Sequence, residues 1–303
     1  MPIVMTQSGI LLIDKPEGPS SAQIVHRVKK ILQAKKVGHL GTLDPFASGL
    51  LLVGVNEGTK IADIFLSGVK SYRGVMVLGI ETDSQDGTGK IINERPVPRL
   101  SDSDLRGVAE KFTGEQRQVP PMFSALKKDG VRLYQLARQG KEIPREPRAI
   151  RIDALRIEKI DGAELEFSVT CSRGTYVRTL AADMGRSLGC GAHLKSLRRT
   201  ACDHLKIEQS IGIEELERCY VKGAVPLMSL GAALSHLRAV TWQSRLLSRL
   251  RLGQQEVLRQ IGERRQGESL VALIDPRGQL AALAEWSNDV AEGRWRLFRV
   301  FRE

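Results

Sequence analysis

The sequence predicts an α+β protein that ends in a small β-rich domain. Segments with apolar residues at helical spacing alternate along the chain with segments in which every second residue is apolar. Two alternating segments, 148–160 and 163–171, meet at Asp161-Gly162, a dipeptide typical of a hairpin turn. After about residue 236 strand patterns dominate. Helices and strands are therefore expected to mix through most of the chain, with mainly strands at its end.

Composition and charge limit the functions that fit the chain. Its 303 residues suggest two domains, or one large domain and a small one. A net charge of +11 indicates a polyanionic partner such as nucleic acid or an anionic membrane, although a basic surface without such a partner fits equally well. No segment approaches the ~18 consecutive apolar residues of a membrane span, and no export signal is found, so a cytoplasmic protein is expected.

No metal or cofactor site is indicated by the residue patterns. The four cysteines match no zinc-binding spacing and the five histidines do not cluster with them, which predicts free thiols in a reducing compartment. The chain has no Walker loop and no strand-linked glycine pattern for a dinucleotide, so no nucleotide cofactor is expected. The acidic loop 81–87 departs from the spacing of a calcium-binding EF-hand.

The first elements lead up to a glycine-rich loop. Residues 9–14 have the apolar run of a short buried strand, and 15–19 form a turn. Ser20 or Ser21 can cap a helix that carries apolar residues on one face. From this local pattern alone, Lys15 is expected to be a solvated lysine of the turn.

The loop 38–49 contains the strongest candidate for a functional side chain. Its three glycines and its proline rule out a helix or a regular strand. Pro45 restricts Asp44 to an extended conformation, and the apolar run 50–53 follows the loop. A loop held between core elements can present one carboxylate accurately. The alternative interpretation is that Asp44-Pro45 simply begins a turn, which is common.

Strands and helices alternate through the middle of the chain. A strand is expected over 70–80, followed by a hairpin-like connection over 81–87. Ser101-x-x-Asp104 resembles a capping box that opens a helix ending near Phe112. These signals are local, so each predicts an element without saying what it packs against.

Two later segments combine basic residues with turn signals. Residues 114–147 are basic and punctuated by prolines, which indicates a surface insertion that includes a short helix over 134–139. After Cys171, a glycine turn leads into a helix running to Leu188, with Arg178 in its first turn. Taken alone, this arginine would be a solvated helical residue.

The last part of the chain predicts a small β-rich domain with one charged face. A basic segment with helical periodicity covers 242–252. Strands are expected over 270–274, 279–286 and 294–301, and the last of these alternates arginines with apolar or aromatic residues.

The loop 38–49 resembles the signature G-H-x-G-T/S-L-D-P-x-A-S/T-G of the TruB family of tRNA pseudouridine-55 synthases. Further motifs of this family follow in the expected order: a Lys-Pro pair, an acidic loop, a Q-x-P-P-x-x-S-A-x-K core, an S-x-G-T-Y-V-R-T turn and a G-C-G-A-H stretch followed by L-x-R. The resemblance spans about residues 10–230. The joint occurrence of these motifs is far more specific than any one of them.

The resemblance implies a fold and a domain organisation. The fold would be the pseudouridine synthase fold, with a mixed, largely antiparallel central sheet and flanking helices. Residues 1–235 would form the catalytic domain, with an RNA-gripping thumb insertion over about 114–147. Residues 236–303 would form a PUA-like RNA-binding domain.

The resemblance also implies a reaction. The enzyme would isomerise uridine 55 in the T loop of tRNA to pseudouridine, breaking a C–N glycosidic bond and rejoining the base through carbon 5 without a cofactor. The base would have to be flipped out of the loop to be reached. Asp44 would be the catalytic residue. It could attack the ribose, add to the uracil ring or remove the 2′ proton, and the sequence does not choose among these.

The resemblance assigns roles to six further residues. Arg178 would pair with Asp44, Tyr72 would stack on the target base and Tyr176 would help line the pocket. Leu197 would pack against the site, His39 would wedge into the RNA loop and Lys15 belongs to the first family motif.

The implied partner is tRNA, bound by a monomer that needs no guide RNA and no second protein. One alternative is a guide-RNA-dependent synthase that shares the Asp44 motif. A second is a non-catalytic RNA-binding or ribosome-assembly protein that has kept the fold. A glycoside hydrolase is disfavoured because it normally uses two carboxylates, and no second motif-borne acid accompanies Asp44.

Overall fold

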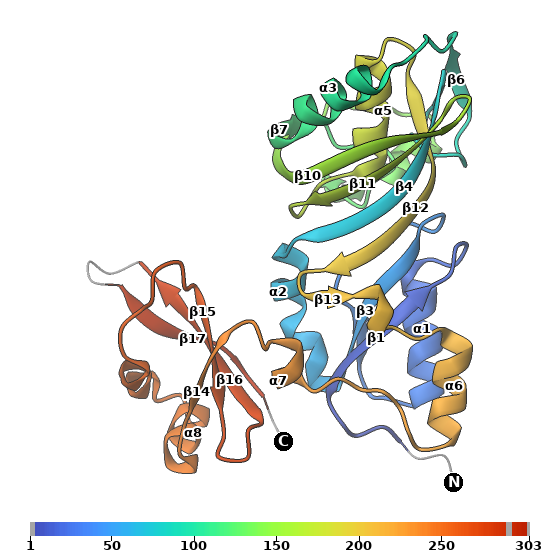
Figure 1. Ribbon diagram of the computed structural model, residues 1–303. Helices are drawn as coiled ribbons and strands as arrows, with labels where there is room; N and C mark the ends of the chain where they lie inside the picture. The colour runs from blue at the N-terminus through green and yellow to red at the C-terminus, as the bar shows by residue number, and fades with distance from the viewer. Residues whose placement is uncertain (1–3, 289–292, 302–303) are drawn as a thin grey trace.

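The protein consists of a long body built on one sheet and a smaller sheet at its side (Figure 1). This computed structural model describes residues 4–288 and 293–301. The body contains a nine-stranded sheet and the side domain a four-stranded one. The expected boundary between 235 and 236 lies in the connection between these two parts.

The central sheet is mixed and largely antiparallel, as predicted. Its main path runs in the order β1, β3, β12, β4, β11, β10 and β7, with β2 beside β3 and β13 beside β12. Within the described chain, the one parallel pairing of this sheet joins β3 to β12. The bounds are β1 (Gly9–Lys15), β2 (Val37–His39), β3 (Ser48–Val55), β4 (Lys70–Leu78), β7 (Gly114–Gln118), β10 (Arg148–Asp161), β11 (Glu164–Cys171), β12 (Ala192–Cys202) and β13 (Leu205–Lys206).

Four helices pack on the sheet through one buried apolar cluster. They are α1 (Ser21–Leu32), α3 (Asp102–Phe112), α5 (Val177–Ser187) and α6 (Ile213–Val221). Figure 1 shows α3 and α5 beside β10 and β11, and α1 and α6 beside β1 and β3. Ser20 caps α1 in a box with Gln23, and Ser101 caps α3 in the predicted box with Asp104.

A second apolar cluster joins the body to the side domain. It includes Phe65 from the body and Phe301 from the C-terminal part. The body contributes η1 (Asn56–Ile61), α2 (Ala62–Ser67) and α7 (Leu230–Ala233). Arg299 adds an ion pair to Asp63 at 2.8 Å, and the Lys60 ammonium donates a 2.8 Å hydrogen bond to the Val300 carbonyl. The side domain is therefore docked on the body by apolar packing and polar contacts together.

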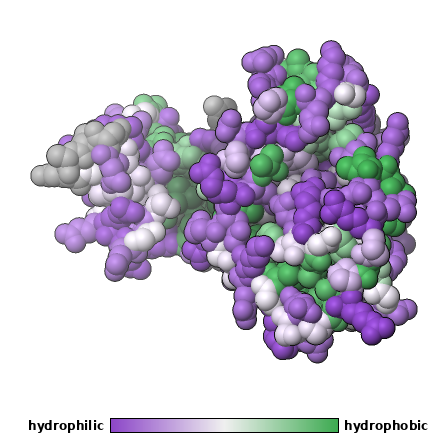
Figure 2. Space-filling view, turned by 90° about the horizontal axis from the view of Figure 1, so that it is seen from above, coloured by the Kyte–Doolittle hydropathy of each residue, from purple (hydrophilic) through white to green (hydrophobic). Residues whose placement is uncertain are grey.

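The side domain confirms the expected β-rich end of the chain and adds one strand to it. Its sheet runs in the order β14, β15, β16 and β17. Of these, β14 was not predicted, and it lies parallel to β15. The bounds are β14 (Arg238–Thr241), α8 (Ser244–Arg251), η3 (Gln255–Ile261), β15 (Leu270–Ile274), β16 (Leu280–Ser287) and β17 (Arg294–Val300). Figure 2 shows this domain projecting from a body whose visible face is mostly hydrophilic.

The structure corrects three predicted boundaries. The loop 38–49 is strand at both ends, because β2 includes Gly38 and His39 and β3 starts at Ser48. The expected strand over 70–80 breaks at Gly79, whose φ of +86° suits glycine. The expected insertion over 114–147 starts too early, since β7 pairs with β10 and only 119–147 lie outside the sheet.

The remaining elements are short and lie around the sheet. They are β5 (Ile80–Thr82), β6 (Ile91–Glu94), β8 (Lys127–Lys128), β9 (Val131–Arg132), α4 (Leu133–Arg138) and η2 (Ile207–Gln209). Across the described ranges, the helices are too short or too polar to cross a membrane.

We expect Phe65→Ala to lower the free energy of unfolding by about 3–5 kcal/mol, because it leaves a cavity in the cluster between the two parts. Leu66→Ala is the matched control on the same helix, since Leu66 is 46% exposed, and it should change stability by less than about 0.5 kcal/mol. Urea denaturation of both variants measures the difference. Equal losses would contradict the packing of α2 described above.

Candidate active site

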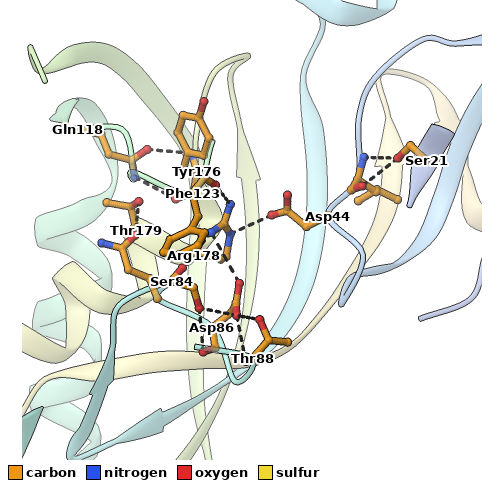
Figure 3. A network of polar contacts seen from close by, with 12 residues as sticks. Ser21, Asp44, Ser84, Asp86, Thr88, Gln118, Phe123, Tyr176, Arg178 and Thr179 are labelled. Carbon is orange, nitrogen blue, oxygen red and sulfur yellow. Dashed lines mark hydrogen bonds and ion pairs between the residues drawn. The ribbon is translucent and has the colours of Figure 1, made fainter. Parts of the chain in front are cut away.

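The backbone on both sides of Asp44 is held by hydrogen bonds. The Ser21 hydroxyl donates to the Leu43 carbonyl at 2.9 Å and accepts from the Leu43 N–H at 2.8 Å (Figure 3). The Asp44 carbonyl in turn accepts from the Ala47 N–H at 3.1 Å. These bonds fix the loop without using the Asp44 carboxylate, which remains available for other groups.

Lys15 supports the far side of the same loop from a fully buried position. Its ammonium donates to the Pro16 and Pro19 carbonyls at 2.8 Å each and to the Pro45 carbonyl at 3.2 Å. The expectation of a solvated turn lysine is therefore wrong. Burial lowers the pKa of Lys15 to about 8, against the attraction of Asp44, which raises it.

Arg199 ties the two ends of the loop together from inside the protein. This buried guanidinium donates to the Leu50 carbonyl at 2.6 Å and to the Thr42 and Gly41 carbonyls at 3.2 Å each. Arg199 lies in the L-x-R part of the motif stretch noted above, but the sequence assigned it no role. The residues next to it do not predict hydrogen bonds to three carbonyls of a distant segment.

Arg178 is the centre of the polar network in Figure 3. Its Nε lies 2.9 Å from Asp44 Oδ2, so the expected ion pair forms. Its Nη1 donates to the Ser84 carbonyl at 2.9 Å and its Nη2 to the Phe123 carbonyl at 2.8 Å. The Arg178 side chain is only 5% exposed, against 41% for Asp44. A solvated helical arginine is thus excluded, and the carboxylate faces solvent from a buried support.

A second carboxylate, Asp86, lies behind Arg178. Its Oδ2 is 3.6 Å from Arg178 Nη1, and its Oδ1 accepts from the Ser84 hydroxyl at 2.7 Å. The N–H and the hydroxyl of Thr88 also donate to Oδ1, at 3.0 and 2.6 Å. Asp86 was not singled out from the sequence, although it belongs to the acidic loop that was. It is buried, so it serves the guanidinium and the loop rather than a ligand.

The start of α5 is fixed by Gln118 at the end of β7. The Gln118 amide donates to the Tyr176 carbonyl at 3.1 Å and accepts from the Tyr176 N–H at 2.8 Å. Tyr176 directly precedes α5, and its ring is half-buried, which raises the pKa of its hydroxyl. This pair of bonds places the turn that carries Arg178, and the sequence did not reveal it.

The other expected site residues lie around the loop without a described hydrogen bond to Asp44. Tyr72 on β4 is half-buried, and burial raises its pKa to about 12 despite the nearby Arg199. Leu197 on β12 belongs to the same buried cluster as Leu43, next to Asp44. His39 ends β2 with its Nδ1 buried and unpaired, and burial together with Arg199 lowers its pKa.

Within residues 4–288 and 293–301, no group of three or more histidine, cysteine, aspartate or glutamate side chains is arranged to hold a metal ion. The four cysteines are free thiols, three of them buried.

Comparison with known proteins decides the family. The model of the TruB family pseudouridylate synthase (N terminal domain) matches residues 29–177, and that of the tRNA pseudouridylate synthase B C-terminal domain matches 178–240. A tRNA pseudouridine synthase B from Geobacter sulfurreducens is 42% identical over 304 residues, covering 97% of this chain and 99% of the relative. The chain belongs to the TruB family. It is therefore an enzyme of the pseudouridine synthase class, as predicted.

A second TruB relative supports the family, and two solved structures share the fold. The tRNA pseudouridine synthase B of Geotalea uraniireducens is 48% identical over 232 residues, covering 76% of this chain and 75% of its own. A chain from an H/ACA RNP bound to a substrate RNA containing 2′-deoxyuridine has a TM-score of 0.72 at 24% identity, covering 97% of this chain and 85% of that one. A chain from a Cbf5-Nop10-Gar1 complex has a TM-score of 0.70 at 25% identity, with the same coverage. The pseudouridine synthase fold is thereby confirmed.

The two TruB models meet at the site. The first contains Asp44 and the second begins at Arg178, so the ion pair joins the two matched segments. The family models end at residue 240, before most of the side domain. The PUA-like character of residues 236–303 remains a prediction.

We expect the unfolding free energy of the wild-type protein to rise relative to Lys15→Met as the pH increases from about 8 to 10.5. The pKa of Lys15 is about 8 in the folded protein and 10.5 ordinarily, so the unfolded chain binds more protons in this interval and stability increases with pH. Urea denaturation of both proteins across this pH range measures the difference in their unfolding free energies. Lys29→Met, at an exposed lysine of α1, is the control and should follow the wild type. Parallel curves for Lys15→Met and the wild type would contradict the prediction.

Proposed function

We propose that the chain isomerises uridine 55 in the T loop of tRNA to pseudouridine, with Asp44 as the catalytic carboxylate. The observation that carries the proposal is a half-exposed carboxylate held by a buried guanidinium, on a loop whose backbone is fixed on both sides. The names of the TruB relatives support tRNA as the substrate class. The position within tRNA rests on the resemblance of the motifs.

The chemistry needs one accurately placed carboxylate and little else. A C–N glycosidic bond is broken and a C–C bond is formed in the same nucleotide. Carbon 5 of the base loses its hydrogen as a proton and the freed ring nitrogen gains one, so no group is donated and nothing is oxidised. Arg178 orients the Asp44 carboxylate through its Nε and provides it with a counter-charge. Attack on the ribose, addition to the uracil ring and removal of the 2′ proton all require this placement, and all remain compatible with the site.

The target base must leave the RNA stack before Asp44 can act on it, at a cost of a few kcal/mol. Tyr72 would offset part of this cost by stacking on the flipped base, since every base offers a π-face. His39 would enter the RNA loop in the place of the flipped base. Leu197 and Tyr176 would line the pocket, and Lys15 supports the protein loop around Asp44 from behind.

The remaining surfaces would hold the RNA. The segment 119–147 is attached to the site through the bond from Arg178 to the Phe123 carbonyl, so it can act as the thumb over the substrate. The side domain would be a PUA-like RNA-binding domain that adds contacts to phosphates, in keeping with the net charge of +11. Such contacts position the substrate without reading its sequence.

We further propose that the enzyme works in the cytoplasm as a monomer, without guide RNA or a protein partner. The second candidate is a partner-dependent enzyme, favoured by the solved structures named as an H/ACA RNP and as a Cbf5-Nop10-Gar1 complex. Activity of the pure chain on bare RNA would separate the two.

We expect the pure protein to release tritium from a minimal T-arm stem-loop labelled on carbon 5 of uridine 55. In Asp44→Asn the release should fall to background while RNA affinity stays within a few-fold, because asparagine lacks the reactive carboxylate but keeps the size of the side chain and an oxygen that can accept from Arg178 Nε. Normal release by Asp44→Asn would disprove the catalytic role. Binding without release by the wild type would instead favour the partner-dependent candidate.

We expect Tyr72→Leu to reduce kcat/KM by about 5- to 150-fold, the range that corresponds to a stacking contribution of ~1–3 kcal/mol per base. Tyr72→Phe is the matched control, because it keeps the ring and loses only the hydroxyl near Arg199. The tritium-release assay measures both variants. A Tyr72→Leu enzyme as fast as the wild type would rule out the stacking role.

A further inference from the structure

We propose that Ser21 is a positioning residue for Asp44 and sets the direction in which the carboxylate points. This inference rests on the proposed catalytic role of Asp44. The Ser21 side chain is buried, and its hydroxyl both donates to and accepts from a single residue, Leu43. The Leu43 N–H donates to the hydroxyl oxygen at 2.8 Å, and the hydroxyl donates to the Leu43 carbonyl at 2.9 Å.

The bond to the Leu43 carbonyl acts on the peptide group that leads directly into Asp44. Because a peptide group is planar, fixing its carbonyl fixes the plane on the N-terminal side of the Asp44 Cα. The plane on the other side is fixed by the bond from the Ala47 N–H to the Asp44 carbonyl. With both planes held, φ and ψ of Asp44 are set, and so is the direction of its Cα–Cβ bond.

Ser21 carries out this task from a rigid support. It is the first residue of α1, whose Ile24, Val28 and Leu32 are buried in the main apolar cluster. The preceding residue, Ser20, caps the helix in a box with Gln23. The helix and its core packing therefore fix the position of the hydroxyl, and the hydroxyl in turn fixes the position of the loop. A site built on a regular element is more accurate than one built on a loop alone.

The direction matters because Asp44 has a second fixed contact. Arg178 Nε lies 2.9 Å from Asp44 Oδ2, and the guanidinium is itself held by the Ser84 and Phe123 carbonyls. If Leu43 shifts, the carboxylate either follows Leu43 or stays with Arg178, and its angle toward the substrate changes in both cases. A misplacement of about 1 Å can slow a reaction by ~10²-fold.

The experiment measures single-turnover tritium release and, separately, the affinity for the T-arm stem-loop. We expect Ser21→Ala to lower the single-turnover rate by about 10- to 100-fold and to leave the affinity within about threefold, because the hydroxyl orients Asp44 and is buried away from solvent. Ser20→Ala is the matched control. It removes the cap of the same helix, one residue away, without touching Leu43, so it should lose stability and keep its rate.

A second pair of variants separates the hydroxyl from the volume of the side chain. Ser21→Thr and Ser21→Val have nearly the same shape and differ in the hydroxyl group. We expect Ser21→Thr to be at least tenfold faster than Ser21→Val at equal affinity for the stem-loop. This pair also decides the question if Ser21→Ala does not fold.

The outcomes distinguish this proposal from the proposed function. If Asp44→Asn is inactive and Ser21→Ala is as fast as Ser20→Ala, Ser21 is only a structural residue and the positioning proposal is overturned. The same holds if Ser21→Thr is no faster than Ser21→Val. If Asp44→Asn is fully active, the proposed function fails first, and the positioning role fails with it.

Discussion

The buried guanidinium of Arg178 is the interaction on which the site depends. A charge removed from water is costly unless it is paired and all its donors find acceptors. Arg178 meets this requirement with Asp44, the Ser84 and Phe123 carbonyls and the more distant Asp86. These partners come from three separate segments, and Arg178 comes from a fourth. Convergence of the four segments therefore stabilises the folded protein, and the same contacts set the geometry of the site.

The same requirement applies to the other two buried cations near the loop. Lys15 and Arg199 each donate to three backbone carbonyls, and five of the six acceptors lie in 16–19 and 41–45, outside the helices and strands. In each case a cation that needs acceptors meets a loop whose carbonyls need donors. The loop around Asp44 is thus rigid although its sequence, rich in glycine and proline, would leave an isolated peptide flexible.

Sequence reasoning succeeded where the signal is local or repeated. The capping box at Ser101 and the hairpin at Asp161-Gly162 depend on neighbouring residues, and both were predicted correctly. It failed where the partner is distant. Arg178 and Lys15 were expected in solvent from their local patterns, yet the partners of Arg178 lie 55 to 134 positions away along the chain. The strand β7 was assigned to an insertion because its charged sequence, GEQRQ, gives no sign of its pairing with β10.

The site is buried on one side and open to solvent on the other, and this asymmetry affects how the reaction would proceed. Every group that holds Asp44 is buried, whereas the Asp44 side chain is 41% exposed. Fixed charges and dipoles stabilise a reacting centre most effectively where water is excluded. The described residues exclude water from the back of the site but not from its front. Under the proposed function, the flipped base must supply the missing wall, held between Tyr72 and the segment 119–147. The chemistry would then begin only after the RNA has closed the site, which would prevent the carboxylate from reacting with bases that only pass by.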